Sequence, residues 1–337
     1  MRLRMYLMLI LFLVPAQGPA AEPDPKQPNI LLLLSDDQRA DTIAQYGNDR
    51  IETPHLDRLA RAGFNFRNAY CFGSPHGAVC EPSRAMLHSG RTFYRVRMDL
   101  NDVRTLGQIL RDAGYETFAT GKWHNGKQSF SKSFLRGQDI MFRGMSNHAK
   151  VPVCDLNTDG TFTAPGNAGL FSSELFSNAA IQFLKSRKRD QPFFCYVSYT
   201  APHDPRMPPG DYATMYPPQD MRPPANFMPL HPFNTGQMTT RDEKLAPWPR
   251  TEQVIRQQTA QYYGMISHLD HQIGRVLATV RQQGLLENTI VIFTSDHGLG
   301  MGSHGLLGKQ NLYEHSMKAP LIVRGPEIEA GSSNALV

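Results

Sequence analysis

Apolar and polar positions follow one another along the chain in a way that predicts repeated helix-then-strand units. Asn29 to Leu34 reads NILLLL, a continuous apolar run that is typical of a strand buried on both faces. Residues 173–188 and 251–284 carry apolar side chains at helical spacing, and each segment precedes another apolar run, PFFCYVSYT and NTIVIFTS. This pattern predicts an α/β domain with a mainly parallel central sheet flanked by helices.

Two shorter helices are marked by the residues that begin and end them. Thr53 and Pro54 supply a capping residue and a proline for the first turn, and Gly63 marks the end of that helix. Thr105 likewise begins the helical segment TLGQILRDAG, which the strand-like run YETFAT follows. The second segment therefore extends the helix-then-strand order.

Residues 201–250 interrupt this order, because they hold 12 of the 25 prolines and show no helical or strand periodicity. A loop of this length in a compact domain is either functional or disordered. We expect it to overhang the pocket and to select the ligand, with Trp248 and several tyrosines available to stack on a ligand ring. Simple surface positions are the alternative for these aromatic side chains. The chain ends just after a strand-like run and a turn, so we expect a truncated domain.

The first residues have the layout of a secretory signal peptide. Two arginines flank a short apolar run from Met5 to Val14, and small residues follow up to Ala21. The run is too short to span a bilayer, although an uncleaved anchor is the alternative. We expect residues 1–21 to be removed and residues 22–337 to form the folded domain. The mature protein is expected to be periplasmic or secreted, with no stable membrane anchor.

Composition and cysteine usage exclude several classes of protein. The apolar and charged fractions, 40% and 19%, are ordinary for a globular domain, and a net charge of +5 without a basic run gives nucleic-acid binding little support. Four cysteines are too few for a disulfide framework, and no CxxC pair is present. Cys195 lies within an apolar run and is expected in the core, while Cys71 and Cys154 are candidates for one disulfide.

Acidic residues follow two of the predicted strands. Asp36 and Asp37 come directly after NILLLL, and Asp296 and His297 come directly after the run TIVIFTS. Ligands of open α/β sheets bind beyond the carboxyl ends of the strands, so both pairs should face one crevice. Carboxylates that converge repel one another unless a cation or a proton separates them. Oxygen ligands favour calcium or magnesium over zinc, and helix caps or turns are the alternative role for each pair.

The segment VCEPSRAMLHSGR places a lone cysteine at a predicted helix start. Pro82 suits the first turn of a helix, so Cys80 would stand at the helix N-terminus, where free N–H groups attract an anion and equally favour a thiolate. Half of a disulfide, a thiolate nucleophile and a precursor of another group all fit this position. A Cys–His protease would need an oxyanion hole, and the sequence shows none.

Basic side chains populate the loops at the same predicted strand ends. Lys122 and His124 follow YETFAT, His203 follows PFFCYVSYT, and Lys309 lies in a glycine-rich loop beyond the second acidic pair. Each alone is most simply a solvated loop residue. Together with a metal and a helix N-terminus, they describe a site for a tetrahedral oxyanion.

These motifs resemble those of the formylglycine-dependent sulfatases in the alkaline-phosphatase-like superfamily. CEPSRAMLHSGR, from Cys80 to Arg91, matches the signature C-x-P-S-R followed by Leu87 and Gly90-Arg91, and GYETFATGKWH matches the second signature. Further segments resemble the family from Asn29 to the end of the chain. The resemblance implies an alkaline-phosphatase-like fold whose smaller C-terminal subdomain is missing here, and a catalytic domain over residues 22–337.

The resemblance implies that Cys80 is oxidised by a formylglycine-generating enzyme to Cα-formylglycine, whose hydrate attacks sulfur and later expels sulfate. A calcium ion, with magnesium as the alternative, would be held by the modified residue and four further side chains, Asp36, Asp37, Asp296 and His297. The family commonly has Asn or Gln at the position of His297. Asp296 would also be a candidate base for the hydrate.

The remaining roles also follow from the resemblance. Arg84 would stabilise the modified residue, and Lys122 and Lys309 would bind the sulfate oxygens. His203 would protonate the leaving group, with Lys309 as a candidate helper. His124 would assist elimination. We therefore expect hydrolysis of sulfate esters on a glycan or a small molecule. The alternatives are a phosphodiesterase or phosphonate monoester hydrolase of the same superfamily, and a truncated, non-catalytic glycan-binding relative.

Overall fold

The computed structural model describes residues 27–72, 79–236 and 238–337. The predicted signal peptide, residues 1–21, lies outside these ranges. Among the helices of the described ranges, none combines the length and the apolar character needed to cross a membrane.

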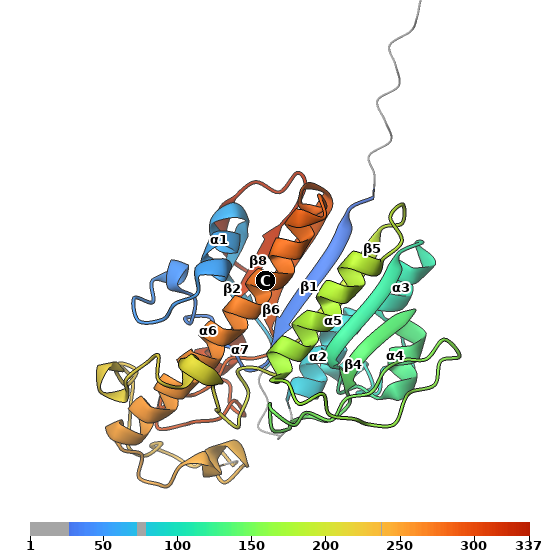
Figure 1. Ribbon diagram of the computed structural model, residues 1–337. Helices are drawn as coiled ribbons and strands as arrows, with labels where there is room; N and C mark the ends of the chain where they lie inside the picture. Colours follow the sequence, from blue (N-terminus) through green and yellow to red (C-terminus); the bar gives the residue numbers. More distant parts are fainter. Residues whose placement is uncertain (1–26, 73–78, 237) are drawn as a thin grey trace, which may run out of the picture.

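The described strands form one nine-stranded sheet (Figure 1). Its order is β4-β3-β5-β1-β6-β8-β2-β7, and β9 pairs with β2. The strands are β1 (Asn29–Ser35), β2 (Phe64–Tyr70), β3 (Glu116–Lys122), β4 (Arg136–Met141), β5 (Phe193–Ser198), β6 (Thr289–Ser295), β7 (Lys318–Ala319), β8 (Leu321–Arg324) and β9 (Gly331–Leu336).

The half of the sheet from β4 to β6 is parallel, which confirms the predicted α/β class. β1 lies at its centre, and Leu32 pairs in register with Tyr196 of β5 and Ile292 of β6. β8 runs antiparallel to β6 and to β2. The carboxyl ends of the parallel strands therefore meet at one edge, as the positions of the acidic pairs required.

Helices cover both faces of the sheet, and the leucines of β1 show how (Figure 1). Leu31 and Leu33 pack in a core with side chains of α1, α5 and α6, whereas Leu32 and Leu34 pack with side chains of α2 and α4. This explains why the strand is apolar at successive positions. The helices are α1 (Pro54–Ala62), α2 (Cys80–Ser89), α3 (Leu106–Asp112), α4 (Lys127–Ser133), α5 (Ser172–Ser186), α6 (Glu252–Gln282) and α7 (Glu314–Met317).

The predicted helix starts are confirmed, but only one is capped as expected. Thr105 and Gln108 form a capping box at the start of α3. The Thr53 side chain makes no capping bond to α1. Instead, the N–H groups of His55 and Leu56 donate to the Asp270 carboxylate of α6, at 3.0 and 2.7 Å. A side chain of the longest helix therefore holds the beginning of α1.

The described part of residues 201–250 contains three short 3₁₀ helices, η3 (Gly210–Ala213), η4 (Pro218–Asp220) and η5 (Asp242–Leu245), but no α-helix or strand. The Trp248 ring packs on the guanidinium group of Arg250, 3.7 Å from the ring centre, and its stacking on a ligand stays a prediction. The segment nevertheless reaches the pocket through other residues, described below.

The disulfide between Cys71 and Cys154 does not form, since both thiols are free. The Cys71 sulfur lies 3.2 Å from a ring nitrogen of His297, and the Cys154 thiol lies 3.6 Å from the carbonyl oxygen of Ile140. The two cysteines thus have different partners. Cys195 is fully buried in β5, as predicted.

Candidate active site

Four parallel strands deliver the predicted polar residues to one place. The residues after their carboxyl ends are Asp36 and Asp37 (β1), His124 (β3), His203 (β5), and Asp296 and His297 (β6), and Lys122 is the last residue of β3. The N–H group of Asp37 donates to the Asp296 carboxylate at 3.0 Å, so the two acidic pairs are in direct contact. The crevice predicted from the sequence is confirmed.

Buried cations compensate the carboxylates at this edge. Asp36 forms ion pairs with Lys122 and with Arg84, while Asp37 pairs with Lys309. Burial raises the pKa of Asp36, but the charges of these cations outweigh burial and hold its pKa well below the usual range. Asp36 is therefore ionised.

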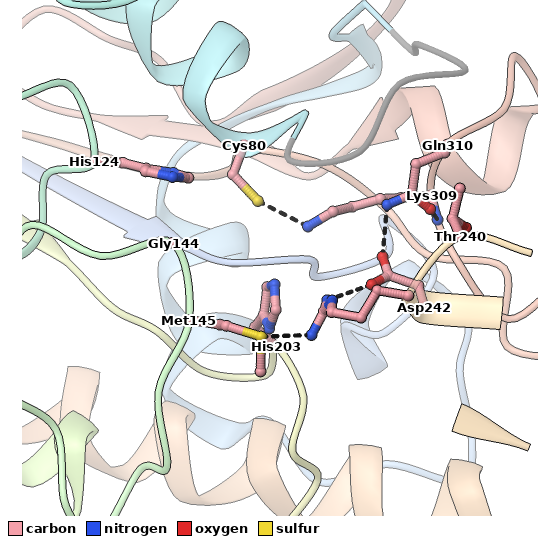
Figure 2. Close-up of a pocket in the computed structure, with 10 residues that line it drawn as sticks. Cys80, His124, Gly144, Met145, His203, Thr240, Asp242, Lys309 and Gln310 are labelled. Atoms are coloured by element: carbon pink, nitrogen blue, oxygen red, sulfur yellow. Dashed lines mark hydrogen bonds and ion pairs between the residues drawn. The ribbon is translucent and has the colours of Figure 1, made fainter. Parts of the chain in front are cut away.

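Cys80 is the first residue of α2, and its side chain points toward Lys309 (Figure 2). Its sulfur lies 2.8 Å from the Lys309 ammonium nitrogen and 3.5 Å from a carboxylate oxygen of Asp36. Burial raises the pKa of the thiol and outweighs the attraction of Lys122 and Lys309. The unmodified side chain is thus a neutral thiol at pH 7, which argues against a thiolate nucleophile.

Arg84, one turn further along α2, is fully buried and joins the helix to the sheet. Its guanidinium group donates to the carbonyl oxygen of Lys122 at 2.7 Å and to the hydroxyl groups of Tyr196 and Ser198. It also pairs with the carboxylates of Asp36 and Asp296, at 3.3 and 3.1 Å. The sequence did not identify Tyr196 and Ser198 because both lie within an apolar strand.

The residues present fit a divalent cation. The side chains of Asp36, Asp37, Cys80 and His203 offer ligand atoms that all lie within 4.8 Å of one another. Burial raises the pKa of Asp37, and burial together with the Asp36 charge raises that of Asp296. Burial makes the ionised form of these two carboxylates costly, and a bound cation would offset that cost.

His297 makes one contact through each of its two ring nitrogens. One of its ring nitrogens lies 3.0 Å from the carbonyl oxygen of Val79, and the other lies 3.2 Å from the Cys71 sulfur. A carbonyl oxygen only accepts, so Nε2 carries the proton. Both ring nitrogens of His297 thus have partners in the protein, and its role as a metal ligand stays a prediction. His203 offers a ligand atom in the same cluster as Asp36, Asp37 and Cys80.

Two further histidines face the pocket in different states of hydrogen bonding. His203 Nδ1 bonds to the carbonyl oxygen of Asp204 at 2.8 Å, and its Nε2 lies 3.6 Å from an Asp37 carboxylate oxygen. The Nδ1 atom of His124 is buried without a partner. Burial and the Lys122 charge lower the pKa of His124 to about 3, so this imidazole is neutral and able to accept a proton.

A cavity of about 320 Å³ opens onto these groups. Figure 2 shows Cys80 and His124 on one side of it and Met145 and His203 on the opposite side. The lining residues are Cys80, His124, Gly144, Met145, His203, Thr240, Arg241, Asp242, Lys309 and Gln310. Sequence reasoning predicted that residues 201–250 would approach the pocket, but it missed Arg241 and Asp242, whose only signal was a charged pair within a proline-rich segment.

Known proteins match both the sequence and the fold. The sulfatase family model matches residues 28–337. The arylsulfatase of Clostridium perfringens is 31% identical over 340 residues, which cover 89% of this chain and 69% of that protein. The N-acetylglucosamine-6-O-sulfatase of Bacteroides thetaiotaomicron is 26% identical over 93% of this chain and 65% of its own length. The chain therefore spans roughly two thirds of these two relatives.

Solved structures give the same result. The putative sulfatase yidJ from Bacteroides fragilis has a TM-score of 0.74 and 26% identity, covering 95% of this chain and 73% of that one. A phosphonate monoester hydrolase of Agrobacterium radiobacter shares the fold, with a TM-score of 0.73 and 22% identity over 92% of this chain and 71% of that one. The family model covers nearly the whole described chain, and the signature residues meet in one buried cluster: the chain belongs to the sulfatase family.

Proposed function

We propose that this protein hydrolyses sulfate esters carried by a glycan. The observation that carries the proposal is the position of Cys80, buried at a helix N-terminus beside Lys309 and Asp36. Family membership supports the reaction, and the relative named for N-acetylglucosamine 6-O-sulfate supports a sugar as the sulfated group.

Two groups that the chain must acquire complete this site. We propose that Cys80 is converted to formylglycine by a formylglycine-generating enzyme, and that the hydrated aldehyde supplies the attacking oxygen. Asp36, Asp37 and Asp296, with His297 and the modified residue, would hold a calcium or magnesium ion. When bound, the ion adds positive charge beside the sulfate oxygens.

The protein's own cations bind and orient the ester. Lys122 and Lys309 are buried, and the charge of Asp36 in one case and of Asp37 in the other outweighs burial and raises the pKa of each ammonium group. Both therefore keep their protons and present fixed positive charge to an anion. Arg84 orients residue 80 by fixing the first turn of α2 against Asp296, to whose carbonyl oxygen Ser83 also donates.

Two histidines are placed to move protons. His203 Nε2 faces the cluster while its Nδ1 is fixed on the Asp204 carbonyl oxygen, so Nε2 is the atom that would protonate the leaving alcohol oxygen. The unpartnered, neutral His124 lies across the pocket beside Cys80 and would accept a proton from residue 80. The two roles require a proton on His203 Nε2 and a neutral imidazole at His124.

Export belongs to the same proposal. The signal-like sequence of residues 1–21 supports release into the periplasm or the medium, where sulfated polymers are accessible. Expression in the native host, followed by fractionation and N-terminal sequencing, tests this point. An intact N-terminus in the cytosolic fraction would contradict it.

A phosphodiesterase or phosphonate monoester hydrolase is the second candidate, favoured by the likeness to such an enzyme in fold. The two activities are separated by turnover of p-nitrophenyl sulfate, p-nitrophenyl phenylphosphonate and bis-p-nitrophenyl phosphate, which release the same alcohol. We expect the highest kcat/KM for the sulfate. A clear preference for either phosphorus ester would replace the proposed function.

Peptide mass spectrometry tests the chemistry directly. Conversion of Cys80 to formylglycine lowers the peptide mass by about 18 Da, whereas other cysteine oxidations add mass. We expect the lowered mass in protein purified from its own host. An unmodified thiol together with turnover of p-nitrophenyl sulfate would contradict the proposed nucleophile.

A further inference from the structure

His148 is a buried histidine, outside the set of side chains that line the pocket, and it bonds to the backbone of His203. Its Nε2 atom lies 2.9 Å from the His203 carbonyl oxygen. A carbonyl oxygen only accepts, so Nε2 of His148 carries a proton and donates it. His148 therefore acts on the backbone of the residue that we assign as the acid for the leaving alcohol.

The other ring nitrogen of His148 is held by two hydroxyl groups. Nδ1 lies 2.9 Å from the hydroxyl oxygen of Ser172, the first residue of α5, and 3.1 Å from that of Thr200. Thr200 donates its one hydroxyl proton to Ser172 at 2.8 Å, which leaves Ser172 to donate to Nδ1. Burial lowers the pKa of His148 to about 4, so the ring is neutral at pH 7 and Nδ1 accepts. The hydrogen bonds thus run in one direction, from Thr200 through Ser172 and His148 to the His203 carbonyl oxygen.

His203 is consequently fixed at three points. Its N–H group donates to the carbonyl oxygen of Thr200 at 3.1 Å, its own carbonyl oxygen accepts from His148, and its Nδ1 atom bonds to the carbonyl oxygen of Asp204 at 2.8 Å. The remaining ring nitrogen, Nε2, lies 3.6 Å from an Asp37 carboxylate oxygen. Loss of the bond from His148 would leave a buried carbonyl oxygen without its donor and would free this backbone to turn.

The main chain around His148 also reaches the pocket. The carbonyl oxygen of His148 accepts from the N–H group of Ser172 at 2.8 Å, so α5 holds both the backbone and the ring of this residue. Gly144 and Met145 precede His148 and line the pocket (Figure 2). His148 therefore joins the segment that lines one part of the pocket to the residue that presents the proton.

We propose that His148 is a positioning residue that sets the direction in which His203 Nε2 presents its proton to the leaving alcohol. This inference rests on the proposed function and adds a residue to its site. The proton on Nε2 passes to the ester oxygen as the sulfur–oxygen bond breaks, and a misdirected ring transfers it poorly. The resulting defect should grow with the basicity of the departing oxygen. A merely structural residue would affect all sulfate esters alike.

The test compares kcat/KM for p-nitrophenyl sulfate and for phenyl sulfate. The p-nitrophenolate ion is a weak base that departs without a proton, whereas phenolate is a stronger base and benefits from one. His148→Phe removes both hydrogen bonds of the ring and keeps an aromatic side chain stacked on Phe171, at 5.3 Å. We expect the variant to lose at least about tenfold more kcat/KM on phenyl sulfate than on p-nitrophenyl sulfate. His148→Gln, whose amide both donates and accepts, should restore most of this difference.

His268→Phe is the matched control, because His268 is a buried histidine that packs on the same Phe171 ring, at 4.9 Å, and bonds to Gln272. It should leave the ratio of the two kcat/KM values at the wild-type level, and circular dichroism checks that each variant is folded. An unchanged ratio in folded His148→Phe would overturn the inference, as would an equal change in His268→Phe.

A second measurement does not depend on turnover. Long-range ¹H–¹⁵N NMR spectra of histidine-labelled protein at pH 7 should show His148 with its proton on Nε2, and His148→Phe should shift the ring resonances of His203. A proton on Nδ1 of His148, or unshifted His203 resonances, would overturn the positioning role. Wild-type protein that shows the expected spectra but hydrolyses neither aryl sulfate would instead contradict the proposed function.

Discussion

The Lys309 ammonium nitrogen lies 2.8 Å from the Cys80 sulfur, although 229 positions separate the two residues in sequence. The same ammonium group pairs with Asp37. Residue 80 therefore has a fixed positive charge beside it. This charge can stabilise the negative charge that develops on the sulfate oxygens during the reaction.

Lys309→Ala should lower kcat/KM for p-nitrophenyl sulfate by about a hundredfold to a thousandfold, the range for loss of one positioned donor to a transition-state oxyanion. Lys244→Ala, at an exposed position of residues 201–250, serves as the control and should retain wild-type turnover. A folded Lys309→Ala protein with more than a tenth of the activity would exclude this role.

Gly144 leaves room for His124, since a Cβ atom at residue 144 would lie 2.8 Å from the His124 Nε2 atom. Gly144→Ala should therefore displace the imidazole and lower kcat by at least about tenfold, because small misplacements of a reacting group are costly. Gly166→Ala is the matched control, since a Cβ atom there meets open space. Equal kcat values for the two variants would show that the position of His124 does not matter.

Arg84→Ala should destabilise the fold by about 3–5 kcal/mol, because it leaves Asp36 and Asp296 buried with less compensation. Urea unfolding of the two proteins measures the difference. The exposed ion pair of Arg97 with Asp99 provides the comparison, and Arg97→Ala should unfold with the wild-type midpoint. Similar midpoints for both variants would count against the joining role of Arg84.

His88, in the last turn of α2, packs against Trp123 and Tyr196, and neither of its ring nitrogens has a partner among the described residues. Burial, with a contribution from Arg84, lowers its pKa to about 3. The unfolded chain binds the proton near pH 6.5 and the folded one does not, so this contribution to stability is complete above pH 6.5 and is lost as pH falls towards 3.

The replacement His88→Phe removes the pH-dependent contribution of the imidazole to stability and keeps an aromatic ring at this position. Between pH 6.5 and 4.5, the free energy of unfolding should fall less steeply in the variant, by up to about 1.4 kcal/mol per pH unit. Urea unfolding at several pH values measures both slopes. Identical slopes would mean that His88 binds its proton equally well in the folded and the unfolded protein.

Removal of divalent cations should abolish turnover and lower the unfolding midpoint, and calcium should restore both. An ion at a hundred times its Kd stabilises the folded state by about 2.7 kcal/mol. Asp37→Asn, which alters one of the clustered ligand groups, should weaken the response of the midpoint to calcium. A midpoint that ignores both chelator and calcium in the wild type would argue against a metal site.

The parts of the fold that could be predicted from sequence are those with local signals. Strands β1, β5 and β6 are continuous apolar runs, and the residues that follow them converge because parallel strands end at one edge. The strand β2 was not predicted, since its sequence FNFRNAY mixes polar and apolar positions. The contact of Asp270 with the start of α1 joins residues 214 positions apart and leaves no local pattern.

The same distinction applies to the candidate site. Asp36, Lys122 and Lys309 were identifiable by their place after strands and by family motifs. Arg241 and Asp242 were not, because the path of a proline-rich segment depends on packing against distant elements. The contacts of His297 with Cys71 and Val79 could not be predicted either. The side-chain conformation of a buried histidine depends on residues that are close in space but distant in sequence.

Arg84 bonds to groups that come from β3, from β5 and from the residues after β1 and β6, so the reacting end of the pocket is held by the sheet itself. Thr240, Arg241 and Asp242 at the mouth of the pocket belong to residues 204–242, whose described part contains no strand. Substitutions in that segment can therefore exchange one sugar preference for another without moving the groups that break the ester bond. Divergence of substrate range within such a scaffold requires changes only in the segment that the sheet does not constrain.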